Sequence, residues 1–242
     1  MQRMLSFGKI VRAPDVRTLY DMTEVIYDKG WLQTAENFDL YFMCREMAQN
    51  EEDLRIMREF GLRYDITVIP PAKLGMEYVK TAGHYHPKAP GASVSYSEIY
   101  QVLEGEAVYL LQKAGKGGRV ADVVVVVAEK GDIVFVPPDY GHVTVNRSDK
   151  VLKMANWVYR DFSSLYDPIR EFGGGAYFLL ESGFVRNPAY CFVPEIRRLE
   201  PSGAELVGLS KGEDMYVLVE NLQNLRFLKE PQTFSGLFAV KV

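Results

Sequence analysis

The sequence predicts an all-β domain, built as a sandwich or a barrel, with a few helices outside it. Between residues 65 and 159, short segments rich in Val, Ile and Tyr alternate with Gly, Pro or charged residues. Many short strands separated by regular turn signals are typical of a sandwich or barrel, and not of alternating strands and helices. The predicted strands span residues 66–69, 76–81, 97–103, 107–112, 120–128, 133–136, 143–146 and 152–159.

The segments before this region contain one strong helix signal. Asn50 can cap a helix whose first turn is acidic, and Gly61 provides its C-terminal stop. Apolar residues lie on one face of this helix at Leu54, Met57 and Phe60. The first fifty residues show no clear period, so we expect only strands and loops there.

Two further helices are expected after the strands. A short one spans about 167–172 and ends at a run of three glycines. A longer amphipathic helix spans about 211–225, because Ser210 and Glu213 form a capping-box pair and apolar residues follow at helical spacing. This C-terminal helix either packs on the outside of the barrel or serves as a subunit contact or a lid.

The bulk composition indicates a soluble globular protein. The chain has 242 residues, of which 48% are hydrophobic and 25% charged, and a net charge of -4, which argues against a nucleic-acid partner. The longest apolar run, Val123 to Ala128, is too short for a membrane span, and no signal peptide is recognised. Cys44 and Cys191 stand alone, which favours free thiols in a reducing compartment. We therefore expect a cytoplasmic protein without a membrane partner.

The three histidines of the chain all lie in the strand-rich region. His84 and His86 stand two residues apart, so in an extended segment both point to the same side. Glu98 lies on the next predicted strand, and His142 follows a strand that ends in a proline turn. Three imidazoles and a carboxylate suit iron, manganese, nickel, cobalt or zinc, and leave an octahedral ion two open positions for a substrate.

These residues resemble the two motifs of the cupin superfamily, whose fold is a double-stranded β-helix, or jelly-roll barrel. The first motif corresponds to His84, His86, Glu98 and Gly105, with a longer gap before the glutamate than in most cupins. The second motif has its members at Gly131, Pro137, His142 and Asn146. Asp139 stands where many cupins have glycine, so the shape of that turn is expected to differ.

A narrower resemblance is to the cupin-type glucose-6-phosphate isomerases of archaea. It is carried by residues 81–88, 96–100 and 136–138, and upstream by 17–22 and 64–68. The resemblance covers about residues 16–190. We therefore expect a cupin isomerase domain over residues 1–194, and a C-terminal extension over 195–242 that packs on the barrel or at a subunit interface.

The resemblance implies a metal-dependent enzyme of glycolysis and gluconeogenesis that interconverts glucose 6-phosphate and fructose 6-phosphate. Mannose 6-phosphate is a further candidate substrate, the subunit is expected to hold one divalent ion with iron favoured, and the assembly to be a homodimer. In the family, Glu98's counterpart has been given the role of the base of a cis-enediol route, and a competing account has hydride shift directly. The sequence leaves both routes open.

The resemblance also implies roles for individual residues. Glu98, Tyr96 and Tyr100 are the expected catalytic residues, and His84, His86, Glu98 and His142 are the expected metal ligands. The phosphate group is expected to bind at Thr67, Thr81, Gly83 and Tyr159. Some relatives carry another active-site histidine on the last barrel strand, where Trp157 or Tyr159 is expected here.

Two other functions are compatible with a cupin. One is an iron or manganese oxygenase or decarboxylase, which would leave the tyrosines beside Glu98 unexplained. The other is a non-catalytic sugar-binding protein, which would leave the complete ligand set unexplained.

Overall fold

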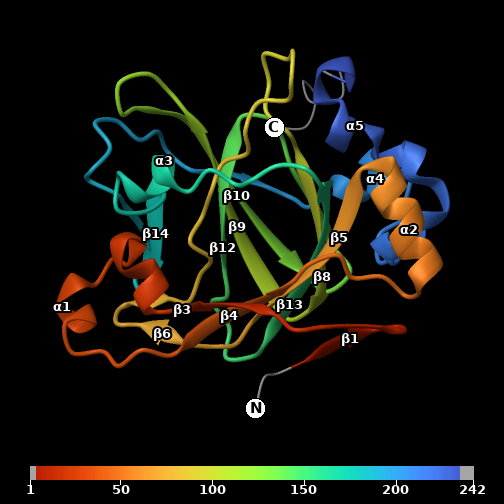
Figure 1. Cartoon of the computed structure of the whole chain (residues 1–242). Helices are drawn as coiled ribbons and strands as arrows, with labels where there is room; N and C mark the ends of the chain where they lie inside the picture. Colours follow the sequence, from red (N-terminus) through yellow and green to blue (C-terminus); the bar gives the residue numbers. More distant parts are fainter. Residues whose placement is uncertain (1–3, 235–242) are drawn as a thin grey trace.

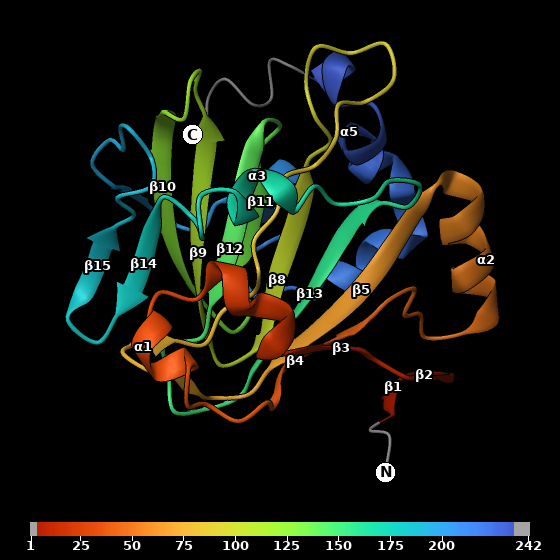
Figure 2. The same cartoon turned by 60° about the vertical axis from the view of Figure 1, so that its left-hand side comes forward.

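The computed structural model describes residues 4–234 of the chain. Two sheets of mainly antiparallel strands face one another and enclose the larger core, as in a jelly-roll barrel (Figures 1 and 2). The six-stranded sheet consists, in spatial order, of β11 (Ile133–Val136), β8 (Glu98–Glu104), β13 (Leu152–Tyr159), β5 (Leu62–Ile69), β4 (Asp39–Cys44) and β3 (Asp15–Thr18). The four-stranded sheet opposite consists of β12 (Tyr140–Val145), β9 (Glu106–Ala114), β10 (Val120–Glu129) and β16 (Arg197–Leu199).

Smaller elements surround the barrel. The other strands are the hairpin β1 (Leu5–Phe7) and β2 (Ile10–Arg12), and a marginal sheet of β15 (Gly183–Arg186), β14 (Tyr177–Leu180), β7 (Glu77–Tyr78) and β6 (Lys73–Leu74). The helices, with η for 3-10 helix, are η1 (Tyr20–Val25), α1 (Lys29–Leu32), α2 (Glu51–Phe60), α3 (Asp167–Arg170), α4 (Gly203–Leu206), η2 (Met215–Leu225), α5 (Arg226–Lys229) and η3 (Pro231–Phe234). Over residues 4–234, none of these helices has the length and hydropathy needed to cross a membrane.

The all-β prediction is confirmed, with small shifts at most strand ends. Predicted strands 133–136 and 152–159 coincide with β11 and β13. The predicted strand 76–81 is interrupted, because Glu77 and Tyr78 form β7 whereas Lys80 makes an isolated bridge with Val145 on β12. The Glu77 side chain forms a buried ion pair with Lys80. The Lys80 ammonium also donates a hydrogen bond to the Val25 carbonyl over 2.8 Å. The sequence did not predict β14 and β15, which are short and lie beyond the barrel motifs.

Side-chain alternation divides the six-stranded sheet into two chemically different faces. On its outer face, Tyr64, Ile66 and Trp157 join a second core with residues of α2, η2 and α5. On its inner face, β5 carries polar side chains at Arg63, Asp65 and Thr67, at the rim of the larger core. The helices therefore cover one face of the sheet, and the other face is available for a site.

The predicted helix after Asn50 is confirmed as α2. The Asn50 side chain accepts a hydrogen bond from the Asp53 amide over 2.9 Å, and Gly61 ends the helix at φ 87°. Leu54 and Met57 are buried against the outer face of the six-stranded sheet. Burial of each such side chain stabilises the fold by roughly 1.5 to 3 kcal/mol.

The predicted continuous helix over 211–225 is wrong in its start and in its type. Asp214 caps a 3-10 helix, η2, and Asn221 interrupts it with an extended φ of -145°. The amide of Ser210 does bond the Glu213 carboxylate, but this pair lies before the helix and does not begin it. The apolar stripe is nevertheless buried on the sheet, where the Trp157 indole donates to the Met215 carbonyl over 3.1 Å. Packing on the sheet has overridden the regular α period.

The proposed division at residue 194 falls between β15 and β16. Residues 1–3 and 235–242 of the two predicted ranges lie outside the described residues. The segment after 194 contributes β16, which pairs parallel with β10, and then η2 and α5 on the outer face of the larger sheet. The predicted second helix is present as α3, which is shorter than expected and ends before the glycine run.

Candidate functional site

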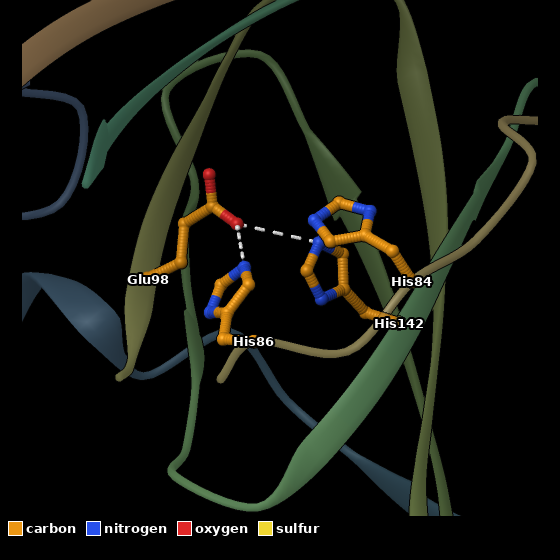
Figure 3. Close-up of side chains that lie close together, drawn as sticks. All are labelled: His84, His86, Glu98 and His142. Carbon is orange, nitrogen blue, oxygen red and sulfur yellow. Dashed lines mark ion pairs between the residues drawn. The ribbon is translucent and has the colours of Figure 1, made fainter. Parts of the chain in front are cut away.

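The barrel brings the three histidines and Glu98 together from distant parts of the chain. His142 lies on β12, and Glu98 is the first residue of β8. His84 lies in an irregular segment that runs antiparallel beside β12, and it pairs with His142 through backbone hydrogen bonds of 3.2 and 3.0 Å. His86 follows two residues later, so both imidazoles enter the interior (Figure 3).

The four side chains present one atom each to a common point. The candidate ligand atoms all lie within 4.8 Å of one another. The Oε2 atom of Glu98 is 3.2 Å from Nε2 of His86 and 3.3 Å from Nε2 of His142 (Figure 3). Among the described residues this Oε2 is buried and has no hydrogen-bond partner. A buried carboxylate oxygen without a donor, facing imidazole nitrogens, fits a cation at this point.

The protonation states also fit a cation. Burial lowers the pKa of His84 and of His142, so both imidazoles are neutral and able to bind a metal. Burial alone would raise the pKa of Glu98, but the imidazoles of His142 and His86 outweigh this effect and lower it. The carboxyl group is therefore ionised. The cluster could hold a transition metal with neutral nitrogen donors and one anionic oxygen.

Two further contacts orient these ligands. Nδ1 of His86 lies 3.1 Å from the carbonyl oxygen of Tyr96, which places the proton on Nδ1. The lone pair of Nε2 is therefore free to bind a metal at the cluster. The side-chain amide of Asn156 donates to Oε1 of Glu98 over 2.6 Å. Each oxygen of Glu98 therefore has a different neighbour.

A cavity opens beside the cluster and continues along the inner face of the six-stranded sheet. The empty space among its walls, including the open mouth, is about 440 Å³. Tyr100 and Thr67, both expected from the sequence, line it together with the cluster residues His84, His86 and Glu98. The other lining residues are Met43, Arg45, Arg63, Asp65, Asn156, Val158, Phe162, Ser164 and Tyr166.

The expected catalytic tyrosines occupy different positions. The Tyr100 hydroxyl lies 3.2 Å from Nε2 of His142, at the cluster itself. Tyr96 precedes β8 and does not line the cavity. Its ring stacks on Phe162 and Tyr159, at centroid distances of 5.2 and 4.6 Å. The strand alternation that related Tyr96 to Glu98 does not hold before the first paired residue.

Three of the expected phosphate ligands do not line the cavity. The Thr81 hydroxyl accepts the Thr144 amide over 3.0 Å. Gly83 has φ 76°, and a Cβ there would lie 2.6 Å from a methyl group of Val143, so the backbone requires glycine. Tyr159 packs against Tyr96. The structure thus brings only Thr67 of this set to the cavity.

The expectation that Trp157 or Tyr159 replaces the missing histidine is wrong. Trp157 is fully buried in the core on the outer face of the sheet. On β13 the inward-facing residues next to it are Asn156 and Val158, and Ser164 and Tyr166 complete this wall from the following loop. Side chains alternate along a strand, so Trp157 points to the opposite face from its neighbours Asn156 and Val158. That alternation could have revealed the orientation of Trp157.

Two arginines at the cavity were missed by the sequence reasoning. Arg45 and Arg63 are the only arginine or lysine residues among its described lining residues. Arg63 is mostly buried and donates from Nε to Asp65 over 2.8 Å, whereas Arg45 pairs with exposed Asp15 over 3.2 Å. Burial raises the pKa of Asp65, although Arg63 opposes this effect. The alternation of residues 63, 65 and 67 on β5 was the signal that could have identified Arg63.

The fold and this site together define a cupin, with three histidines and a glutamate gathered inside a jelly-roll barrel. The chain belongs to the glucose-6-phosphate isomerase family, because the family model described as "Glucose-6-phosphate isomerase (GPI)" matches residues 14–191.

Individual relatives agree with this family. The glucose-6-phosphate isomerase of Thermococcus litoralis is 31% identical over 171 residues, which are 70% of this chain and 82% of that protein. The same enzyme of Thermococcus onnurineus is 34% identical over 185 residues, 75% of this chain and 87% of that protein. Among solved structures, oxalate decarboxylase from Bacillus subtilis matches 52% of this chain and 26% of its own, with 15% identity and a TM-score of 0.35.

Proposed function

We propose that the protein is an isomerase that interconverts glucose 6-phosphate and fructose 6-phosphate. The observation that carries this proposal is the family match, since the chain is 31% identical to an isomerase of that name and covers 82% of it. The matched residues 14–191 include the complete histidine and glutamate cluster. A metal ion held by this cluster would polarise two neighbouring oxygens of a sugar, which suits an aldose–ketose isomerase.

The cluster is the proposed binding place for the oxygens on C1 and C2. A metal ion held by His84, His86, Glu98 and His142 would supply Lewis-acid polarisation of these oxygens. Tyr100 is placed to donate a hydrogen bond to one of them, because its hydroxyl lies at the cluster. Burial, followed by the charge of Glu98, raises the pKa of Tyr100, so its hydroxyl keeps its proton. Tyr96 contributes at one remove, by packing on Phe162, which in turn packs on His86.

The environment of Glu98 favours a ligand role over a base role. Its Oε2 faces the imidazoles, its Oε1 accepts from Asn156, and its pKa is lowered. A carboxylate with a lowered pKa, with one oxygen held by an amide and the other in the ligand position, is a weak base. We therefore propose that hydride shifts between C1 and C2 while Glu98 keeps its place in the ligand set, and that the enediol route is the alternative.

We assign the phosphate end of the substrate to Thr67, Arg63 and Arg45. Val158 pairs with Arg63 on one side and with Glu98 on the other, so these two residues lie two strands apart. Strand spacing makes that separation roughly 10 Å. An extended hexose 6-phosphate spans roughly 8 to 9 Å from O2 to phosphorus, along a zigzag of bonds of about 1.5 Å. The arginine side chains and the Thr67 hydroxyl can supply the donors that a phosphate requires.

Finer properties complete the proposal. We propose iron as the bound metal, since it is one of the ions that the mixed nitrogen and oxygen donor set suits, and mannose 6-phosphate as a second substrate. A homodimer is supported by the edge strand β3, where Val16 is exposed. A cytoplasmic location is supported by the unpaired Cys44 and Cys191. Metal analysis of protein purified without added metal, and light scattering, would test the first and third of these points.

The decisive experiment is a coupled assay of fructose 6-phosphate conversion on protein stripped with a chelator and then reloaded with Fe²⁺, Mn²⁺, Ni²⁺, Co²⁺ or Zn²⁺. We expect conversion to disappear on stripping and to return with at least one ion. Oxygen uptake measured in parallel would identify an oxygenase. Fully loaded protein without conversion would refute the isomerase proposal and leave the fold and cluster unaffected.

A further inference from the structure

The two oxygens of Glu98 are held in different environments. Oε1 accepts a hydrogen bond of 2.6 Å from Nδ2 of Asn156. Oε2 faces the nitrogens of His86 and His142 and has no donor among the described residues. Both Glu98 and Asn156 are at least nine-tenths buried, so water does not compete freely for these contacts. The Asn156 amide is therefore the group that makes the two oxygens of Glu98 different.

The backbone holds Asn156 rigidly in this position. Asn156 lies in the middle of β13, which is paired on both sides, opposite Tyr100 on β8 and Asp65 on β5. Glu98 is two residues before Tyr100 on its strand, which makes it a diagonal neighbour within reach of a side chain. The orientation of the amide is also determined, because only its NH₂ group can donate to an ionised carboxylate.

Asn156 is unexpected on structural grounds alone. The inward residues that flank it on β13 are Met154 and Val158, both apolar. A buried amide is unfavourable unless its hydrogen bonds are made, and an apolar residue of similar size would avoid that requirement. The contact with Glu98 gives the amide a specific use.

We propose that Asn156 is a positioning residue that makes Glu98 a ligand through one oxygen. With Oε1 held by the amide, the carboxylate cannot turn to offer both oxygens to a cation. An ion held by the cluster would then remain accessible to the two oxygens of a sugar. This inference rests on the proposed metal site, but it does not require the sugar to be a hexose phosphate.

The test uses the intact chain and Mn²⁺ as the probe. Metal-free wild type, Asn156→Leu and Asn156→Ser are titrated with Mn²⁺, and the bound ion is examined by electron paramagnetic resonance. Met154→Leu is the matched control, because it changes the same face of the same strand and nearly conserves volume. We expect a changed spectrum for both Asn156 variants, with a loss of about 10- to 100-fold in Mn²⁺ affinity or in kcat, the usual effect of removing a partner of a metal ligand. The control should keep the wild-type spectrum.

Other outcomes would overturn the inference or separate it from the proposed function. Wild-type spectrum, affinity and kcat in a folded Asn156→Leu protein would refute it. If neither Asn156 variant folds while Met154→Leu does, the amide serves the fold and the inference is wrong. A wild type that binds Mn²⁺ without isomerising any sugar phosphate would refute the proposed function, while the spectral comparison would still decide the role of Asn156.

Discussion

Replacement of Glu98 by Gln separates the two roles that this residue could have. The change keeps the size of the side chain and one carbonyl oxygen, but removes the negative charge. Asn156 donates to Oε1 in the wild type, so the oxygen of the new glutamine could remain on that side and turn its NH₂ toward the imidazoles. Alternatively, the Asn156 amide turns over and accepts from the NH₂ of the new glutamine, which returns the carbonyl oxygen to the ligand position. The second arrangement preserves four ligands, at lower affinity.

The magnitudes distinguish the roles. If Glu98 is only a ligand, metal affinity falls by at least about 10-fold, since even an outer partner of a ligand has that effect. Saturating metal should then restore kcat to within about 10-fold of wild type. If Glu98 is the base, kcat falls by about 100- to 10,000-fold and metal does not restore it. The pKa of Glu98 is lowered, and its Oε1 is held by the Asn156 amide. We therefore expect saturating metal to restore kcat.

The assay is fructose 6-phosphate conversion across a metal titration, with bound metal measured at each point. His142→Ala is the comparison, because it removes a ligand that has no proposed part in proton transfer. We expect both variants to recover with added metal. A Glu98→Gln protein that is fully loaded and still more than about 100-fold slower than wild type would refute the ligand-only reasoning and favour the enediol route.

Three other perturbations test the phosphate assignment, the fold and the electrostatics. Arg45→Ala should raise the KM for fructose 6-phosphate by about 10- to 100-fold, since a hydrogen bond to a charged group contributes about 1.5 to 3 kcal/mol. The ion pair of Arg45 with Asp15 is exposed, so thermal stability should hardly change. An unchanged KM would remove Arg45 from the phosphate site. Glu77→Ala leaves the Lys80 ammonium buried without its carboxylate partner and should lower the free energy of unfolding by about 3 to 5 kcal/mol. The control is Glu52→Ala, which breaks an exposed ion pair with Arg55. Equal denaturation midpoints for the two variants would contradict the argument. Burial lowers the pKa of His84 and of His142, so the unfolded chain takes up their protons first and the metal-free protein should lose stability as pH falls below about 6.5. Thermal unfolding at several pH values checks this expectation. If the double variant His84→Gln/His142→Gln loses as much stability per pH unit as the wild type, the effect belongs to other groups.

The sequence by itself determined the features that depend on neighbouring residues. The cap at Asn50 and the stop at Gly61 define α2, because capping involves residues only a few positions apart. Residues 133–136 and 152–159 are strands by their apolar and β-branched composition. The cluster was predictable because the spacing of His84 and His86 places both on one side, and because the cupin motifs name Glu98 and His142 as their companions.

Only the tertiary structure decided which residues meet across strands. Asn156 reaches Glu98 because β13 pairs with β8 in a particular register, and nothing local indicates that register. Trp157, one of the two residues that the sequence analysis expected at the site, packs instead in the core on the outer face of the sheet. The C-terminal segment adopts an interrupted 3-10 helix instead of the regular α-helix that its apolar spacing predicted. Its apolar residues pack on the surface of the sheet, and this packing determines the conformation of the segment. Local patterns define the elements and the metal ligands, and long-range packing determines what surrounds those ligands.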